Sequence, residues 1–264
     1  MSVSKKRIVV KVGTSTITNE NGNVDIRALD HLCRAIAGAE NLGYDLVLVS
    51  SGAIAVGAGK MRLPQKPSEI RMKQAAAAVG QTELMHLYDK LFGEYNRMVG
   101  QILLDNADFS NSQRSENLKN TFEALLENHV IPIVNENDSV SHTEIESEKK
   151  LFSDNDMLSA LVAIFCNASK LIIFSDIDGL YDGNPSVDAD AKLISRVEKI
   201  TDELKSVASG SGSNRGTGGM ITKLEAAELA TSHGIDVLIT NGKNPEKLYD
   251  IIEKKKVGTL FVAQ

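Results

Sequence analysis

Five short runs of apolar, mostly β-branched residues recur along the chain and are separated by segments that favour helices. These runs are Ile8–Val12, Leu46–Val49, Ile131–Val134, Leu171–Phe174 and Val237–Thr240. Strands that are buried on both faces have this near-continuous apolar pattern, whereas half-exposed strands alternate. Examples of the helical segments are Ser68–Tyr95, Ser112–Asn128, Asp156–Cys166, Met220–Ser232 and Pro245–Lys254. The first of these is expected to break near Gly80. Strands that alternate with helices need crossover connections, so the pattern predicts a doubly wound α/β fold with a largely parallel sheet and helices on both faces.

Length and composition indicate a single globular domain. The chain has 264 residues, of which 42% are hydrophobic and 24% charged, so it can bury a substantial core and is not a disordered chain. No internal repeat and no proline-rich linker divides it. The polar segment Ser139–Leu151 is expected to form a hairpin or loop, and Ser209–Gly219 is a low-complexity segment. We therefore expect one domain over residues 1–264.

Charge and cysteine usage exclude several classes of protein. The chain has 29 basic and 35 acidic side chains, a net charge of −6, and no long basic run, which argues against a protein that coats nucleic acid or anionic membranes. Its two cysteines, Cys33 and Cys166, form neither a C-x-x-C pair nor a zinc-binding pattern and are expected to be reduced. No signal peptide and no apolar stretch of about 18 residues is present. These features predict a cytoplasmic protein without a nucleic-acid or membrane partner.

Small polar and charged residues follow four of the predicted strands. They are Lys11 with Gly13–Ser15, then Ser50–Gly52, Asn135–Asp138 and Ser175–Asp176. In open parallel sheets, ligands bind beyond the carboxyl ends of the strands. A site is therefore expected at this edge of the sheet, although strand ends are often polar without any function.

Glycine-rich loops and two lysines suggest that the ligand is an anion. Gly13–Ser15 and Ser51–Ala53 follow strands, and Gly216–Met220 opens a helix whose first turn carries Lys223. Glycines let backbone N–H groups approach an anion closely, and helix N-termini favour negative charge. Each loop is also compatible with an ordinary turn. Lys11, which ends an otherwise apolar strand, requires an anionic partner.

Carboxylates near these loops allow two interpretations. Asp154, Asn155 and Asp156 open a predicted helix, where Asp154 is suited to be an N-cap, but two aspartates exceed what capping requires. Asp138 is suited to bind an amino group or to form an Asx turn. The sequence contains no P-loop, G-x-G-x-x-G, H-E-x-x-H or G-x-S-x-G motif, and its five histidines lie outside every glycine-rich segment.

Two lysines, anion-binding loops and a few carboxylates suit phosphoryl transfer, in which the protein positions and neutralises phosphates. The lack of an obvious general base points to a carboxylate as acceptor. With a pKa near 4.3, a carboxylate is already ionised at neutral pH and needs no base. Its difficulty is repulsion from the γ-phosphate, about 4 kcal/mol for two unit charges 4 Å apart at an effective dielectric of 20.

At these residues the chain resembles the amino acid kinase family, and within it the members that phosphorylate glutamate. The resemblance covers essentially the whole chain. Its motifs are Val9–Ser15, Val49–Ile54, Ala78–Gln81, Val134–Asp138, Asp154–Asp156, Asp178–Tyr181, Gly216–Lys223 and Gly258–Phe261.

The resemblance implies a three-layer α/β/α sandwich with a central, mostly parallel sheet. It implies that the protein uses ATP and Mg²⁺ to phosphorylate the γ-carboxylate of L-glutamate, the first step of proline biosynthesis. By matching positions, Lys11 and Lys223 would neutralise the transferring phosphoryl group and Asp156 would orient both lysines. Ser51, Asp138 and Asn155 would bind glutamate. The residues that would line the nucleotide site are Lys11, Ser175, Asp176, Thr217, Gly218, Gly219, Met220, Ile221, Thr222 and Lys223. The part of the chain before about residue 170 would mainly bind glutamate, and the part after it the nucleotide.

The resemblance also implies partners. Proline is expected as a feedback inhibitor, a γ-glutamyl phosphate reductase as the next enzyme, and a homo-oligomer as the assembly. Many members carry a further C-terminal RNA-binding-like domain, whereas this sequence ends at Gln264, as expected of a short form. It also has Asn184-Pro185 where Asp-Pro is common, and a longer Ser139–Lys150 segment.

Two alternatives remain at this point. Another member of the family, such as an acetylglutamate, aspartate or nucleoside-monophosphate kinase, would share most of these motifs, although Asn135–Asp138 argues against it. An inactive amino acid or nucleotide sensor on the same fold would not need Lys11, Asp156 and Lys223.

Overall fold

The protein is described by a computed structural model. The structure describes residues 6–19, 22–140, 154–183, 185, 188, 190–209 and 219–264. Most of Ser139–Leu151 and of Ser209–Gly219, together with Asn184, lies outside these residues, so the expectations for those segments are not addressed.

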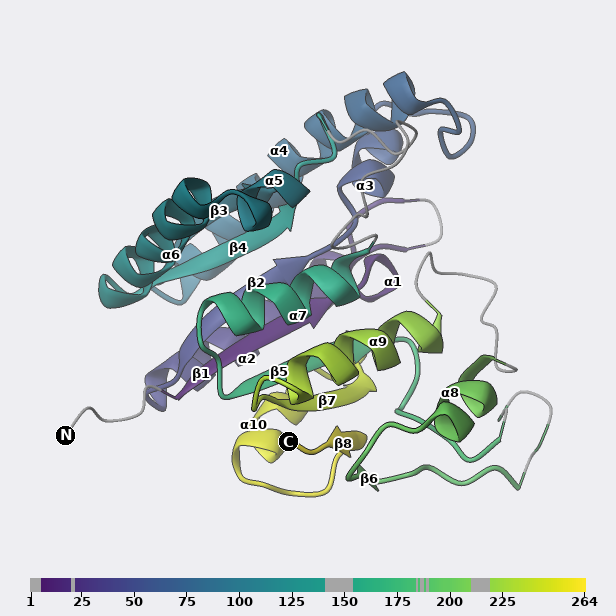
Figure 1. The fold of residues 1–264 in the computed structure, drawn as a ribbon. Helices are drawn as coiled ribbons and strands as arrows, with labels where there is room; N and C mark the ends of the chain where they lie inside the picture. Colours follow the sequence, from purple (N-terminus) through teal and green to yellow (C-terminus); the bar gives the residue numbers. More distant parts are fainter. Residues whose placement is uncertain are drawn as a thin grey trace.

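An eight-stranded sheet forms the centre of the molecule (Figure 1). Its strands are β1 (Arg7–Val12), β2 (Asp45–Ser50), β3 (Met98–Leu104), β4 (Val130–Glu136), β5 (Lys170–Ser175), β6 (Arg196–Val197), β7 (Asp236–Asn241) and β8 (Thr259–Phe261). Their order across the sheet is β3-β4-β2-β1-β5-β7-β8-β6, and every neighbouring pair is parallel except β7 and β8. The first strand therefore lies in the middle, where Lys11 is paired with Val49 of β2 on one side and Ile173 of β5 on the other.

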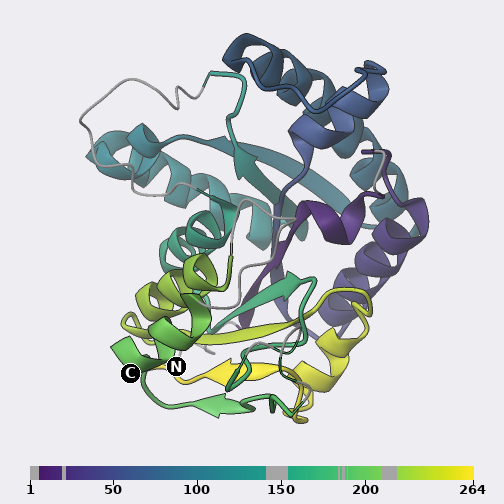
Figure 2. The ribbon, with the colours of Figure 1, turned by 90° about the vertical axis from the view of Figure 1, so that its right-hand side faces the viewer.

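Helices cover both faces of the sheet, which gives the predicted three layers (Figure 2). The helices are α1 (Thr14–Ile17), α2 (Ile26–Asn41), α3 (Ala53–Lys60), α4 (Ile70–Glu94), α5 (Asn106–Ser110), α6 (Ser112–Glu127), α7 (Asn155–Phe165), α8 (Asp202–Ser209), α9 (Met220–Thr231) and α10 (Lys247–Ile252). Two apolar clusters hold the layers together. One joins α6, α7 and α9 to one face of the sheet, and the other joins α2, α4 and α10 to the opposite face.

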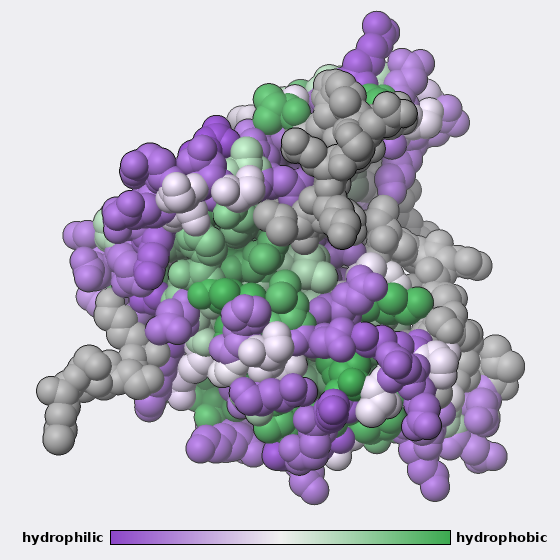
Figure 3. Space-filling view, in the orientation of Figure 1, coloured by the Kyte–Doolittle hydropathy of each residue, from purple (hydrophilic) through white to green (hydrophobic). Residues whose placement is uncertain are grey.

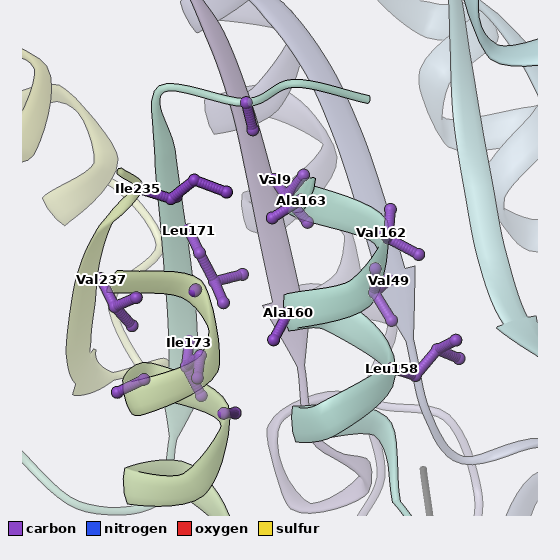
Figure 4. Packing of buried hydrophobic residues seen from close by; sticks show 14 of the residues in the cluster. Val9, Val49, Leu158, Ala160, Val162, Ala163, Leu171, Ile173, Ile235 and Val237 are labelled. Atoms are coloured by element: carbon purple, nitrogen blue, oxygen red, sulfur yellow. The ribbon is translucent and has the colours of Figure 1, made fainter. Parts of the chain in front are cut away.

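The packing of α7 on the sheet illustrates the first cluster. Its apolar side chains, among them Val162 and Ala163, lie over Val9 and Val49 of two adjacent strands (Figure 4). Side chains buried in this way contribute about 25 cal/mol per Å² of apolar surface removed from water. In the space-filling view, hydrophobic residues remain visible where α6 adjoins α7, and hydrophilic residues surround them (Figure 3).

The five predicted strands are confirmed, each slightly longer than expected. The predicted break near Gly80 is wrong, because α4 continues through it from Ile70 to Glu94. A Cβ atom on Gly80 would lie 1.8 Å from the carbonyl oxygen of Ala53 in α3, and one on Gly57 would lie 1.7 Å from that of Ala76 in α4. These glycines therefore allow α3 and α4 to cross at close range.

The other predicted helices differ only at their ends. For example, α7 begins at Asn155 rather than Asp156, and α10 spans Lys247–Ile252 rather than Pro245–Lys254. In the described part of the chain, no helix combines the length and the apolar character that crossing a membrane would require.

Candidate active site

Three charged side chains from distant parts of the sequence meet in the interior at the carboxyl end of β1. Lys11 is the last but one residue of this strand, Asp156 lies in the first turn of α7, and Lys223 lies in the first turn of α9. The Nζ atom of Lys11 is 2.6 Å from Oδ1 of Asp156, and the Nζ atom of Lys223 is 3.0 Å from Oδ2. Asp156 is 1% exposed, Lys11 7% and Lys223 6%. The anionic partner that Lys11 was expected to need is thus Asp156, which both lysines share.

The electrostatics of this cluster keep Asp156 ionised. Burial alone would raise the pKa of Asp156, but the ammonium groups of Lys11 and Lys223 outweigh this effect and hold the pKa below its usual value. A carboxylate with a lowered pKa in the folded state stabilises that state. This contribution is complete above the usual pKa of about 3.9 and is lost as the pH falls through the lowered value. At neutral pH the cluster therefore carries two positive charges and one negative charge.

The first turn of α7 directs two neighbouring side chains toward different partners. Asp154 is the N-cap, and its Oδ1 accepts hydrogen bonds from the backbone N–H groups of Asp156 (2.9 Å) and Met157 (3.0 Å). Of the two interpretations of Asp154, capping is therefore the one realised. With the turn fixed, Asp156 points to the lysines, whereas Asn155 points to the end of β2, where its Nδ2 donates to Oγ of Ser51 at 2.8 Å. Two of the predicted glutamate-binding residues are thus in direct contact.

Asp138, the third of them, lies on the wall of a pocket beside this contact. The pocket has a volume of about 150 Å³, enough for several water molecules, and lies between α3, α4 and the ends of β3 and β4. Ala53, Gln81 and Glu136 are among its other lining residues. The structure therefore places Asp138 at a cavity next to the carboxyl edge of the sheet.

Of the other predicted nucleotide-binding residues that the structure describes, Ser175 and Asp176 lie at the carboxyl end of β5, and Gly219 to Lys223 lie at the start of α9. Ser175 is buried and donates from Oγ to Oδ1 of Asp176 at 3.0 Å, while Asp176 itself is exposed. Gly219 is the N-cap of α9, and as a glycine it has no side chain with which to cap this end. Backbone N–H groups at a helix start are suited to bind an anion.

Residues of the first turn of α9 differ in their environment. Ile221 is 41% exposed, and Met220 is partly buried. Thr222 Oγ1 lies 2.9 Å from the carbonyl oxygen of Gly219 and 3.3 Å from Oδ2 of Asp156, so its hydroxyl faces the carboxylate of the cluster. Thr217 and Gly218 lie outside the described residues.

Two residues of this region were not among the predicted site residues. Asn135, at the end of β4, is 2% exposed and accepts a hydrogen bond from Nδ2 of Asn155 at 3.0 Å. Gln81 of α4 accepts one from Nδ2 of Asn135, also at 3.0 Å. The available signal for Asn135 was a polar residue directly after an apolar run, but nothing in the sequence pairs it with Gln81.

Carboxylate and imidazole groups do not gather into a metal site in the part of the chain that the structure describes. No group of three or more His, Cys, Asp or Glu side chains there is arranged to hold a metal ion. The carboxylate of Asp156 is already shared by two lysines.

Known proteins match the chain along nearly its whole length. The model of the amino acid kinase family matches residues 6–241. A glutamate 5-kinase of Clostridium perfringens is 54% identical over 259 residues, which are 98% of this chain and 96% of the relative. A glutamate 5-kinase of Listeria innocua is 49% identical, covering 99% of this chain and 94% of the relative.

Solved structures share the fold at low sequence identity. A carbamate kinase from Giardia lamblia bound to AMP-PNP has a TM-score of 0.66 at 15% identity, with 99% of both chains covered. An isopentenyl phosphate kinase of T. acidophilum, solved as a product complex, has a TM-score of 0.65 at 16% identity, with 96% of this chain and 99% of the other covered. At these identities the likeness shows the fold alone.

Proposed function

Because the chain belongs to the amino acid kinase family, we propose that it transfers the γ-phosphoryl group of ATP to the γ-carboxylate of L-glutamate. The products are ADP and γ-glutamyl phosphate, and the reaction opens proline biosynthesis. The reaction type is supported above all by the buried cluster of two lysines on one aspartate. The choice of glutamate is supported by about 50% identity to two glutamate 5-kinases over nearly the entire chain.

The proposed mechanism is a direct transfer without a covalent enzyme intermediate. The attacking carboxylate of glutamate is ionised at neutral pH and needs no general base. The main barrier is electrostatic, because an anion must approach the negatively charged γ-phosphate. Lys11 and Lys223 would neutralise the charge that moves between the acceptor, the phosphoryl group and ADP. Asp156 would hold both ammonium groups in place, so that little reorganisation is needed during the reaction.

Binding of the two substrates is proposed to divide along the chain. Ser51, Asp138 and Asn155 would bind glutamate, since Ser51 and Asn155 are in contact and Asp138 lines the adjacent pocket. ATP would be bound by Lys11, Ser175, Asp176 and the segment from Thr217 to Lys223. The part before about residue 170 would thus mainly hold glutamate, and the part after it the nucleotide.

Mg²⁺ accompanies ATP in this reaction and, when bound, supplies charge neutralisation on its phosphates. The described residues form no cluster of carboxylates that could hold Mg²⁺. We therefore propose that the ion is held mainly by phosphate oxygens and water. The chain's own share of the neutralisation then falls to Lys11 and Lys223.

The decisive experiment measures ADP release from ATP with a panel of acceptors. Glutamate should support turnover, and N-acetylglutamate, aspartate, uridine monophosphate, carbamate and isopentenyl phosphate should not. Turnover with another acceptor but not with glutamate would assign the chain to a different reaction of the family. Binding of glutamate or ATP without any ADP release would identify a sensor instead.

We also propose an inhibitor, proline, and a partner enzyme, a reductase, both of which follow from this activity. Proline resembles cyclised glutamate and is proposed to inhibit by occupying the same pocket. A reductase that consumes the labile acyl phosphate is the proposed next enzyme. Without it, 5-oxoproline should accumulate together with ADP, whereas γ-glutamyl phosphate that persists for hours would contradict this. Assembly into a homo-oligomer stays a prediction.

A further inference from the structure

We propose that Gln81 of α4 is a positioning residue that fixes the orientation of the Asn155 side-chain amide through Asn135. The proposal rests on the proposed function only in naming glutamate as the ligand that Asn155 meets. Gln81 would act through other residues, without touching the substrate.

A continuous line of hydrogen bonds joins the three amides. Nδ2 of Asn135 donates to Oε1 of Gln81 at 3.0 Å. Nδ2 of Asn155 donates to Oδ1 of Asn135 at 3.0 Å. The same Nδ2 also donates to Oγ of Ser51 at 2.8 Å and approaches the carbonyl oxygen of Ser50 at 3.3 Å. The line therefore runs from the middle of α4 to the end of β2.

Backbone groups fix the direction of this line. The backbone N–H of Glu136 donates to Oδ1 of Asn135 at 2.9 Å, and the carbonyl oxygen of Ser50 faces the NH₂ group of Asn155. If the Asn135 amide turned over, its NH₂ group would face the N–H of Glu136 and its oxygen would face Oε1 of Gln81. Donor would then meet donor and acceptor would meet acceptor, so only the observed orientation satisfies every group.

This orientation decides what Asn155 offers to a ligand. Both hydrogens of its NH₂ group are used inside the protein, so its Oδ1 is left as a hydrogen-bond acceptor. Ser51 accepts from Asn155 and keeps its own hydroxyl hydrogen for donation. The pair thus presents one acceptor and one donor, which suits an amino acid with an ammonium and a carboxylate group.

Gln81 can hold the Asn135 amide in this orientation because α4 is packed tightly against α3 at that point. It is 9% exposed and follows Gly80, where α4 crosses α3 at close range. Without an acceptor at position 81, the buried NH₂ group of Asn135 would lose its partner, and only the backbone N–H of Glu136 would still hold the Asn135 amide in its orientation. When the Asn135 amide moves, Asn155 loses one of the three acceptors around its NH₂ group, and its orientation is held less firmly by Ser50 and Ser51 alone.

The first test replaces Gln81 with methionine, which keeps the length of the side chain and removes the acceptor oxygen. The KM for glutamate should rise about tenfold, with kcat within about twofold and the KM for ATP unchanged. Gln113→Met is the matched control, because it breaks a similar hydrogen bond, from Nε2 of Gln113 to Asn117, on the exposed surface of α6. An unchanged KM for glutamate in Gln81→Met would overturn the proposal.

A double-mutant cycle separates positioning from direct contact. Asn135→Ala removes the link between Gln81 and Asn155, so adding Gln81→Met to it should change the KM for glutamate no further. If Gln81→Met raises KM by the same factor in both backgrounds, Gln81 contacts glutamate itself and the proposal is wrong.

A measurement without substrate keeps the test independent of the proposed function. In ¹⁵N-labelled protein, the side-chain NH₂ signals of Asn155, identified by their loss in Asn155→Asp, should exchange slowly with solvent. Exchange should become faster in Gln81→Met and stay slow in Gln113→Met. Equal exchange in all three proteins would overturn the proposal. Wild-type protein that releases no ADP with glutamate would defeat the proposed function, while the exchange rates would still decide the role of Gln81.

Discussion

Lys11 and Lys223 bind the two oxygens of one buried carboxylate, so each lysine can be removed while the other keeps its partner. Replacing either lysine with methionine keeps the aliphatic length and deletes the charge. Interactions that are strongest in the transition state lower kcat when they are lost. Loss of one such preorganised group should lower kcat by about 10² to 10³, or about 3–4 kcal/mol. Steady-state kinetics with glutamate and ATP measures this.

The same variants must be separated from a simple loss of stability. A melting curve for each variant gives this control, because a purely structural role would lower Tm and activity in parallel. Lys223→Met with normal kcat would contradict the proposed mechanism.

Asp138 and Asn155 should respond differently from the lysines. Their proposed contacts to glutamate exist before and during the reaction, so Asp138→Ala and Asn155→Ala should mainly raise the KM for glutamate. The KM for ATP should change little. Substrate-saturation curves for both substrates check this, and a fall in kcat with an unchanged KM for glutamate would argue against these contacts.

At the residue scale, the sequence predicted that the charged residues of the site lie close together, but it did not predict the hydrogen bonds around them. Lys11 lies near the carboxyl end of a strand, Asp156 and Lys223 lie in the first turn of a helix, and such positions converge at one edge of a parallel sheet. The contact between Gln81 and Asn135 depends on how α4 lies against β4. No short sequence pattern predicts how α4 packs against β4.

Among the elements, the crossing of α3 and α4 gives the sharpest prediction. Gly80→Ala would place a Cβ atom 1.8 Å from a backbone oxygen of α3, so the helices would have to move apart, at a cost of about 1–3 kcal/mol in the free energy of unfolding. Gly93→Ala, in the same helix, has nothing within 4 Å of the new Cβ and should stabilise the protein by about 0.5–1 kcal/mol. Chemical denaturation of both variants makes the comparison. Equal effects would mean that the close crossing is not what requires glycine at position 80.

The three strands that the sequence analysis did not predict are too short or too interrupted to give an apolar run. β6 and β8 have two and three residues, too few for any periodicity to be visible. β3 is an edge strand in which Gly100 and Gln101 interrupt the apolar residues. The central strands were predictable because burial on both faces makes them apolar throughout. The break near Gly80 was wrong because glycine there reflects a tertiary contact, which outweighs its low helix propensity.

For the whole molecule, inhibition by proline is the property to test. If proline occupies the glutamate pocket, raising the concentration of glutamate should relieve inhibition completely, and KM should rise with proline while kcat stays constant. Initial rates over a grid of glutamate and proline concentrations measure this. Inhibition that saturating glutamate does not relieve would place proline at a separate site.

The central position of β1 has a consequence for how the protein is made. During synthesis, β1 can pair with β2 soon after both have left the ribosome. Its other neighbour, β5, begins about 120 residues after β2 ends and is synthesised much later. At typical translation rates of about 5–20 residues per second, this interval lasts roughly 6–24 s. During that time the edge of β1 that later pairs with β5 is apolar and unpaired in the nascent chain. Substitutions that delay β5 should therefore lower the yield of newly synthesised protein through aggregation, even where the finished molecule is as stable as before.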